Sequence, residues 1–287
     1  MRHIPTFGVI SFLSLLASFA SLSRADEVAD KGREIFKKNQ RAVVTVQVVV
    51  KMKFSVPGMG GQANESKQDV TGTVIDRSGL TVLALSSCEP GDLLQGMMAG
   101  MSDEDTKFKM ETELSDVKLL LDDGTELPAD IVLRDKDLDL AFVRPMTKPA
   151  SPMTALDLSK SATAQVLDQV ITLNRLGKAA GRAYAASVER ISAVVQKPRL
   201  FYVPGSEMTS TTLGSPAFSL DGNVLGVFVM RTVSQRGGGI GMFNFRPQGL
   251  TTIILPAADI LKAARQAPEA KASEGKNEEP KESKEKK

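Results

Sequence analysis

The sequence predicts an all-β fold, a barrel or a sandwich, with one short helix at each end. About a dozen runs rich in β-branched and other apolar residues alternate with turn signals, and the turns recur about every 8 to 12 residues, which is typical of antiparallel β domains. A length of 287 residues and a hydrophobic content of 42% are enough for one large β domain or two small ones.

The first elements can be predicted from residue spacing. A helix is expected at residues 26–39, where apolar residues such as Ile35 and Phe36 stand at helical spacing among charged ones. Residues 42–50 are β-branched almost throughout, so they predict a strand. Residues 52–68 contain three glycines, one proline and few large apolar groups, and we expect a loop there.

The rest of the chain continues the β pattern. Residues 69–85 predict a hairpin with its turn at residues 77–79, and the Pro/Ser/Thr-rich residues 147–163 predict a link between two halves. A last helix is expected at residues 256–266, with Pro256 in its first turn. The other predicted strands are residues 117–121, 129–133, 138–143, 165–176, 183–195, 200–203 and 250–255.

Three features that could be taken for a binding site have simpler interpretations. Residues 237–241 are glycine-rich but lack the following helix and lysine of a phosphate-binding loop, so they predict a hairpin tip. The methionine cluster at residues 96–101 predicts core filling or a loop packed on the barrel, with an adaptable binding surface as the alternative. Cys88 is the one cysteine, so no intramolecular disulfide and no thiolate metal cluster can form, and we expect a buried thiol. The sequence therefore predicts no cofactor and no metal.

Charge excludes one class of partner. The net charge is +2, and the basic residues are spread out or mixed with acidic ones, so a nucleic-acid partner is not expected. Residues 267–287 consist of Glu, Lys, Pro and Ser with almost no large apolar residue, which predicts a disordered tail. A charged tether to another envelope component is the alternative for this tail.

The N-terminus is typical of an exported protein. A basic start is followed by the apolar residues 7–22 and by small residues at positions −3 and −1 of a cleavage site after Ala25. These features predict a signal peptide at residues 1–25 and a periplasmic or extracellular location. An uncleaved membrane anchor is the alternative, and no later segment is apolar enough to span a membrane.

One stretch carries a resemblance to a known family. Residues 211–226 read Thr-Thr-Leu-Gly-Ser-Pro, a short strand, the turn Asp221-Gly222 and a second strand. The stretch resembles the nucleophile loop of trypsin-like serine peptidases, above all of their HtrA-like branch. Two further stretches, residues 72–86 and 138–143, resemble that family in the same order along the chain.

The resemblance implies a specific architecture. The family has two packed six-stranded β-barrels, which would occupy residues 40–146 and 164–256 within one domain of residues 26–266. No PDZ-like domain is expected to fit after residue 266, which departs from most HtrA-like proteins.

The resemblance also assigns the catalytic positions. The nucleophile position falls on Leu213, the aspartate position on Asp139, and the histidine position on Ser86, or on Ser87 if the match slips by one residue. The oxyanion loop falls on Thr212, Gly214 and Ser215, the last of which replaces a glycine.

These assignments predict a domain without catalysis. The one histidine of the chain, His3, lies in the predicted signal peptide, so a histidine-dependent mechanism lacks its proton shuttle. A binding module that holds an extended peptide or a partner strand by β-augmentation is the preferred interpretation. The alternatives are a peptidase with a non-standard nucleophile (Ser210, Ser215 or Ser219) and a purely structural scaffold.

Overall fold

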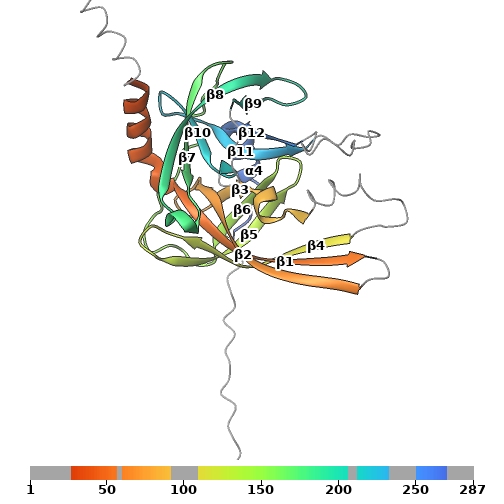
Figure 1. Ribbon diagram of the computed structural model, residues 1–287. Coiled ribbons are helices and arrows are strands. Elements are labelled where there is room, and N and C mark those ends of the chain that lie inside the picture. Colours follow the sequence, from red (N-terminus) through yellow and green to blue (C-terminus); the bar gives the residue numbers. More distant parts are fainter. Residues whose placement is uncertain (1–26, 57–59, 92–108, 206–211, 233–249, 270–287) are drawn as a thin grey trace, which may run out of the picture.

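The structure is a computed structural model that describes residues 27–56, 60–91, 109–205, 212–232 and 250–269. In these ranges, twelve antiparallel strands form two closed six-stranded barrels that pack against each other (Figure 1). The predicted all-β fold with two six-stranded barrels is therefore confirmed.

The first barrel has the strand order β1-β2-β3-β6-β5-β4. A one-turn helix, α2, follows β3, and its residues Leu85 and Cys88 are buried in the core of the first barrel. The elements are β1 (Val43–Val56), β2 (Gly60–Val74), β3 (Thr81–Ala84), α2 (Leu85–Cys88), β4 (Lys109–Leu120), β5 (Glu126–Asp135) and β6 (Leu140–Pro145).

The second barrel repeats this organisation with the order β10-β11-β12-β9-β8-β7. It is followed by the C-terminal helix α4, for which Pro256 is the N-cap residue. The elements are β7 (Gln169–Arg175), η2 (Lys178–Ala180), β8 (Tyr184–Val195), β9 (Phe201–Pro204), β10 (Pro216–Ser219), β11 (Val224–Thr232), β12 (Leu250–Pro256) and α4 (Ala257–Ala264).

The largest hydrophobic core lies between the barrels rather than inside one of them. It combines buried side chains of β3 and β6 with buried side chains of β11 and β12. The two terminal helices close this core, because Ile35 of the helix at residues 27–39 and Ile260 of α4 are both buried in it. Both predicted helices are confirmed, and their apolar faces explain why they form.

The interpretation of residues 52–68 as a loop is wrong. The strands β1 and β2 pair without a break from Val43↔Thr73 to Val56↔Gly60, so this segment is the outer part of a long hairpin. Its polar residues are compatible with a strand because both faces of the ribbon are open to solvent here, as the exposed side chains of the consecutive residues 63–65 show. Glycine content indicated a loop here, whereas cross-strand pairing decided the structure.

Several smaller predictions are corrected or lie outside the described residues. Asp139 does not lie within a strand; it ends the turn at residues 136–139 that precedes β6. None of the helices among the described residues is long and apolar enough to cross a membrane. The predictions for residues 1–25, 96–101, 237–241 and 270–287 concern segments outside the described ranges.

Candidate functional site

The site is built around the turn that precedes β6. The side chain of Asp135 accepts hydrogen bonds from the N–H groups of Asp137 and Leu138, which fixes the turn. Asp139 then adopts a left-handed conformation with φ +56°, which aspartate tolerates better than most residues. Its carbonyl oxygen accepts a hydrogen bond of 3.0 Å from the N–H of Leu85, which ties the turn to the start of α2.

The carboxylate of Asp139 joins three chain segments. Oδ1 accepts a hydrogen bond of 2.7 Å from the N–H of Ser86, and Oδ2 accepts one of 2.9 Å from the hydroxyl of the same serine. Oδ2 also accepts a hydrogen bond of 2.6 Å from the N–H of Met230 in β11. Asp139 therefore connects α2 of the first barrel with β11 of the second.

Burial and hydrogen bonding have opposite effects on this carboxyl group. Desolvation raises the pKa of Asp139 to about 6, and the hydrogen bonds from Met230 and Ser86 lower the pKa only part of the way back. Ser86 occupies the place beside Asp139 that the resemblance assigns to histidine, but its hydroxyl cannot take up a proton near neutral pH. The hydroxyl is instead a donor to the carboxylate.

We expect the free energy of unfolding to fall as the pH rises from about 4 to about 6. Folded Asp139 has a pKa of about 6 and the unfolded group one of 3.8, so the folded state binds the proton more tightly. The stabilisation by the Asp139 proton is fully present below pH 3.8 and is lost as the pH rises through about 6. The total loss in the free energy of unfolding is at most about 3 kcal/mol. Urea unfolding followed by circular dichroism between pH 4 and 7 measures this dependence.

The variant Asp139→Asn is the control for that pH profile. It cannot titrate, so the part of the slope between pH 4 and 6 that belongs to Asp139 should disappear. The pKa of Asp76 is lowered mainly by its hydrogen bonds with Ser78, so its contribution to the free energy of unfolding is lost only as the pH falls below that window. This loss should be the same in both proteins. Identical slopes in the two proteins would contradict the assignment.

Leu213 fills the position that the resemblance assigns to the nucleophile. Its side chain is only 6% exposed and belongs to the core between the barrels, together with residues such as Leu140 and Val229. The position is thus occupied by a hydrocarbon side chain that contributes to the packing of the two barrels.

The residues after Leu213 form a tight turn that anchors this loop. The N–H of Ser215 donates to the carbonyl of Thr212 at 3.0 Å, and Gly214 has φ +84°, as the third residue of a type II turn requires. The carbonyl of Gly214 accepts a hydrogen bond of 2.8 Å from the hydroxyl of Thr73 in β2. The resemblance places a glycine at Ser215, and serine fits there because the residue that needs positive φ is Gly214.

The structure describes two of the three serines named as alternative nucleophiles, Ser215 and Ser219, together with the nearby Ser87 and Cys88. Ser215 is fully buried, and the hydroxyl of Ser219 faces the carbonyl of Asn223 at 3.5 Å within the hairpin turn. The hydroxyl of Ser87 is buried without a hydrogen-bond partner among the described residues. Burial raises the pKa of Cys88 to about 12, so its thiolate is scarce at neutral pH. Ser210 lies outside the described residues.

The strand β11 presents a backbone edge beside Asp139. The backbone groups of successive residues in β11 point to opposite sides of the strand. Phe228, Met230 and Thr232 therefore direct their N–H and C=O groups away from β12. Phe228 uses both groups in hydrogen bonds with Gly214 and Ser215, and Met230 uses its N–H on Asp139. Among the described residues, none pairs with the C=O of Met230 or with the backbone groups of Thr232 on this side.

Sequence reasoning missed the part played by Met230. A backbone N–H carries no signature in the sequence, since any residue except proline supplies one. Its position opposite Asp139 follows only from how the second barrel docks on the first. The described residues contain no group of three or more His, Cys, Asp or Glu side chains that could hold a metal ion.

Two closed six-stranded barrels, with an acidic residue before β6 and a glycine turn before β10 at their interface, define a trypsin-like domain. The family model described as trypsin-like peptidase domain matches residues 70–227, more than half of the chain. The chain therefore belongs to the trypsin-like peptidase domain family.

Other comparisons found similar structures but no curated relative. The apo MamO protease domain from Magnetospirillum magneticum is 15% identical, with a TM-score of 0.48 over 79% of this chain and 97% of that chain. The crystal structure of Deg5 is 15% identical, with a TM-score of 0.49 over 82% of this chain and 92% of that chain. No curated protein matches the sequence.

Proposed function

We propose that this chain is an exported member of the trypsin-like family that has no peptidase activity and binds an extended peptide or a partner strand. The observation that carries the proposal is the side chain of Leu213, buried in the core between the barrels at the nucleophile position. Ser86 beside Asp139 and the single histidine, His3, support it further, because no imidazole can serve as the base. The apolar residues 7–22 support export.

The free edge of β11 supports a binding role. An extended peptide that pairs with the C=O of Met230 and with the backbone groups of Thr232 would add a strand at this edge, beside Asp139. Such pairing uses backbone hydrogen bonds for affinity and needs neither a nucleophile nor a base. Loss of catalysis therefore leaves this binding mode intact.

The first test compares catalysis with binding in the chain from Asp26 onward. We expect neither hydrolysis of unfolded β-casein nor labelling by a serine-directed fluorophosphonate, together with a rise in anisotropy when the protein is added to fluorescein-labelled β-casein. Turnover that disappears when one serine is replaced by alanine would establish the non-standard peptidase instead. Absence of both turnover and binding, in a folded sample, would favour the scaffold.

The substitution Thr232→Pro should weaken casein binding by about fivefold to tenfold. Proline removes the N–H at the free edge and with it one backbone hydrogen bond, worth about 1 kcal/mol. The matched control is Thr163→Pro, at an exposed position in the segment between the barrels. Anisotropy titrations measure both affinities, and equal affinities for the two variants would place the peptide elsewhere.

A further inference from the structure

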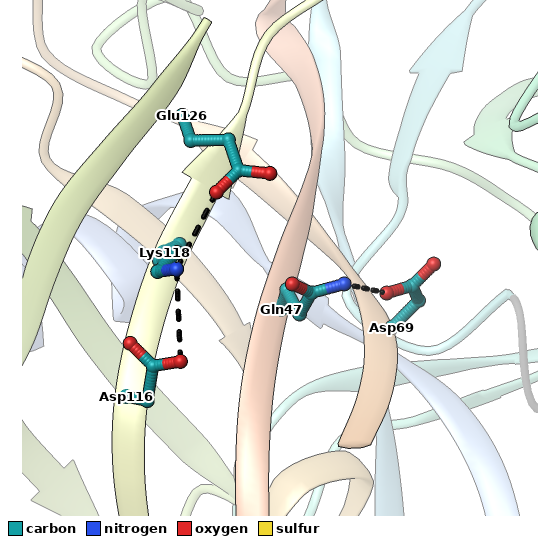
Figure 2. A network of polar contacts seen from close by, with 5 residues as sticks. All are labelled: Gln47, Asp69, Asp116, Lys118 and Glu126. Carbon is teal, nitrogen blue, oxygen red and sulfur yellow. Dashed lines mark hydrogen bonds and ion pairs between the residues drawn. The ribbon is translucent and has the colours of Figure 1, made fainter. Parts of the chain in front are cut away.

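The first barrel closes between β4 and β5 through a short pairing. These strands pair only at Lys118↔Pro128, Leu119↔Leu127 and Leu120↔Glu126. Figure 2 shows this end of the pairing, where Lys118 lies between the carboxylates of Asp116 and Glu126 at 3.6 and 3.4 Å. Beyond it, β4 pairs only with β1 and β5 only with β6 among the described residues.

Irregular backbone separates the two strands. The pairing of β4 with β1 shifts between Gln47 and Val49, next to Asp116, whose φ is +47°. The pairing of β5 with β6 shifts between Ile131 and Leu133. Such bulges bend a strand away from its neighbour, so the two edges diverge and face each other across a gap.

The gap is a groove of about 590 Å³ that is lined by apolar and acidic side chains and by one basic side chain, Arg134. Leu114 and Val117 line it from β4 and Ile131 from β5, while Asp116 and Asp130 stand on opposite sides. Within the described chain, Asp130 makes no ion pair. None of the residues that surround Asp139 lines this groove, so it is a separate feature of the molecule.

The C-terminal segment reaches the groove. After α4 the chain crosses from the second barrel to the first, and Pro268 and Glu269 line the groove. Arg144 of β6 holds them, because its Nε donates to the carbonyl of Pro268 at 2.9 Å and its guanidinium lies 3.5 Å from the carboxylate of Glu269. The side chain of Arg144 is 14% exposed and that of Glu269 is 87% exposed, so the contact places Glu269 at the open side of the groove.

We propose that the residues immediately after Glu269 dock in the groove as an extended strand along the free edge of β4. They read Ala-Lys-Ala-Ser-Glu-Gly, in which four of the six residues are small, and the charge of Lys271 is opposite to that of Asp116 and Asp130. A strand of five or six residues is sufficient to use the edge, and the tether at Glu269 keeps it at a local concentration of the order of millimolar. The C-terminal segment would then become a seventh strand of the first barrel and link the two barrels.

A disulfide trap tests which segment occupies the groove. In the chain from Asp26 onward with Cys88→Ala, Ser115→Cys at the groove is combined with Ala272→Cys and oxidised with glutathione disulfide. We expect an intramolecular disulfide to form about tenfold faster than in the control pair Ser78→Cys with Ala272→Cys. Ser78 is exposed, lies 3.2 Å from the guanidinium of the same Arg144 and does not line the groove, so this control is also close to the tether. Equal rates would overturn the proposal, and a product that is only a covalent dimer would assign the groove to a second copy.

Hydrogen exchange provides the second measurement, without any cysteine. Removal of residues 270–287 should speed exchange of the β4 amides at residues 109–117 by about tenfold, because the strand that protects them is lost. The charge reversal Asp130→Lys should reproduce part of this effect, and combining it with Lys271→Asp should restore protection. Unchanged exchange after truncation would show that this segment does not occupy the groove.

Discussion

Replacing Gly214 by alanine is expected to lower the free energy of unfolding by about 4 kcal/mol or more. A Cβ at this position would overlap the carbonyl oxygen of Thr71 in β2, which belongs to the other barrel. The glycine cannot move away, because its N–H donates to Phe228 and its carbonyl accepts from Thr73, both at 2.8 Å. The overlap can be relieved only by separating the barrels. Urea unfolding followed by far-ultraviolet circular dichroism measures the loss, since the chain has no tryptophan.

The matched control for this substitution is Gly124→Ala. Gly124 has φ +85°, almost the same as Gly214 at +84°, but an added Cβ would meet no atom within 4 Å. Gly124→Ala should therefore lower the free energy of unfolding only through the unfavourable backbone conformation of alanine at positive φ, by about 1 kcal/mol. If the two variants were equally destabilised, close packing of the barrels at Gly214 would not be the cause.

The features that could be predicted from the sequence are those set by local chemistry. The turn around Gly79, the Asp221-Gly222 hairpin and the two terminal helices follow from residue type and spacing, and all are present. The contact between Ser86 and Asp139 could be expected only from the family resemblance. The two residues are 53 positions apart in the chain, and the sequence around neither of them points to the other.

The features that could not be predicted depend on how distant segments pair. Glycine content in residues 52–68 indicated a loop, yet residues 52–56 of β1 and residues 60–68 of β2 pair with each other as strands. The gap between β4 and β5 depends on bulges that have no sequence signature at Asp116 or Ile131. The bond from Arg182 to Asp69, 2.7 Å long, joins the barrels on another side, and Gln47 also binds that carboxylate (Figure 2). Composition and spacing give no information about such docking contacts.

Shortening Leu213 should be the second costly change, with an expected loss of about 2 to 5 kcal/mol for Leu213→Ala. The side chain is 6% exposed and packs with residues of both barrels, so its removal leaves a cavity that neither barrel can fill alone. The control is Leu167→Ala, because Leu167 is 66% exposed and its substitution should cost less than about 0.5 kcal/mol. Similar unfolding midpoints for the two variants in urea would contradict a packing role for Leu213.

The same reasoning predicts the effect of a serine at residue 213, the position that the resemblance assigns to the nucleophile. Leu213→Ser opens the cavity of the alanine variant and also places a hydroxyl in an apolar core, so it should be at least as destabilising as Leu213→Ala. It should also remain inactive against casein, because Ser86 beside Asp139 supplies no base. If Leu213→Ser were instead as stable as the parent chain, the interface would not depend on this side chain. Destabilisation without activity would mean that residue 213, which the resemblance assigns to the nucleophile, serves the packing of the two barrels.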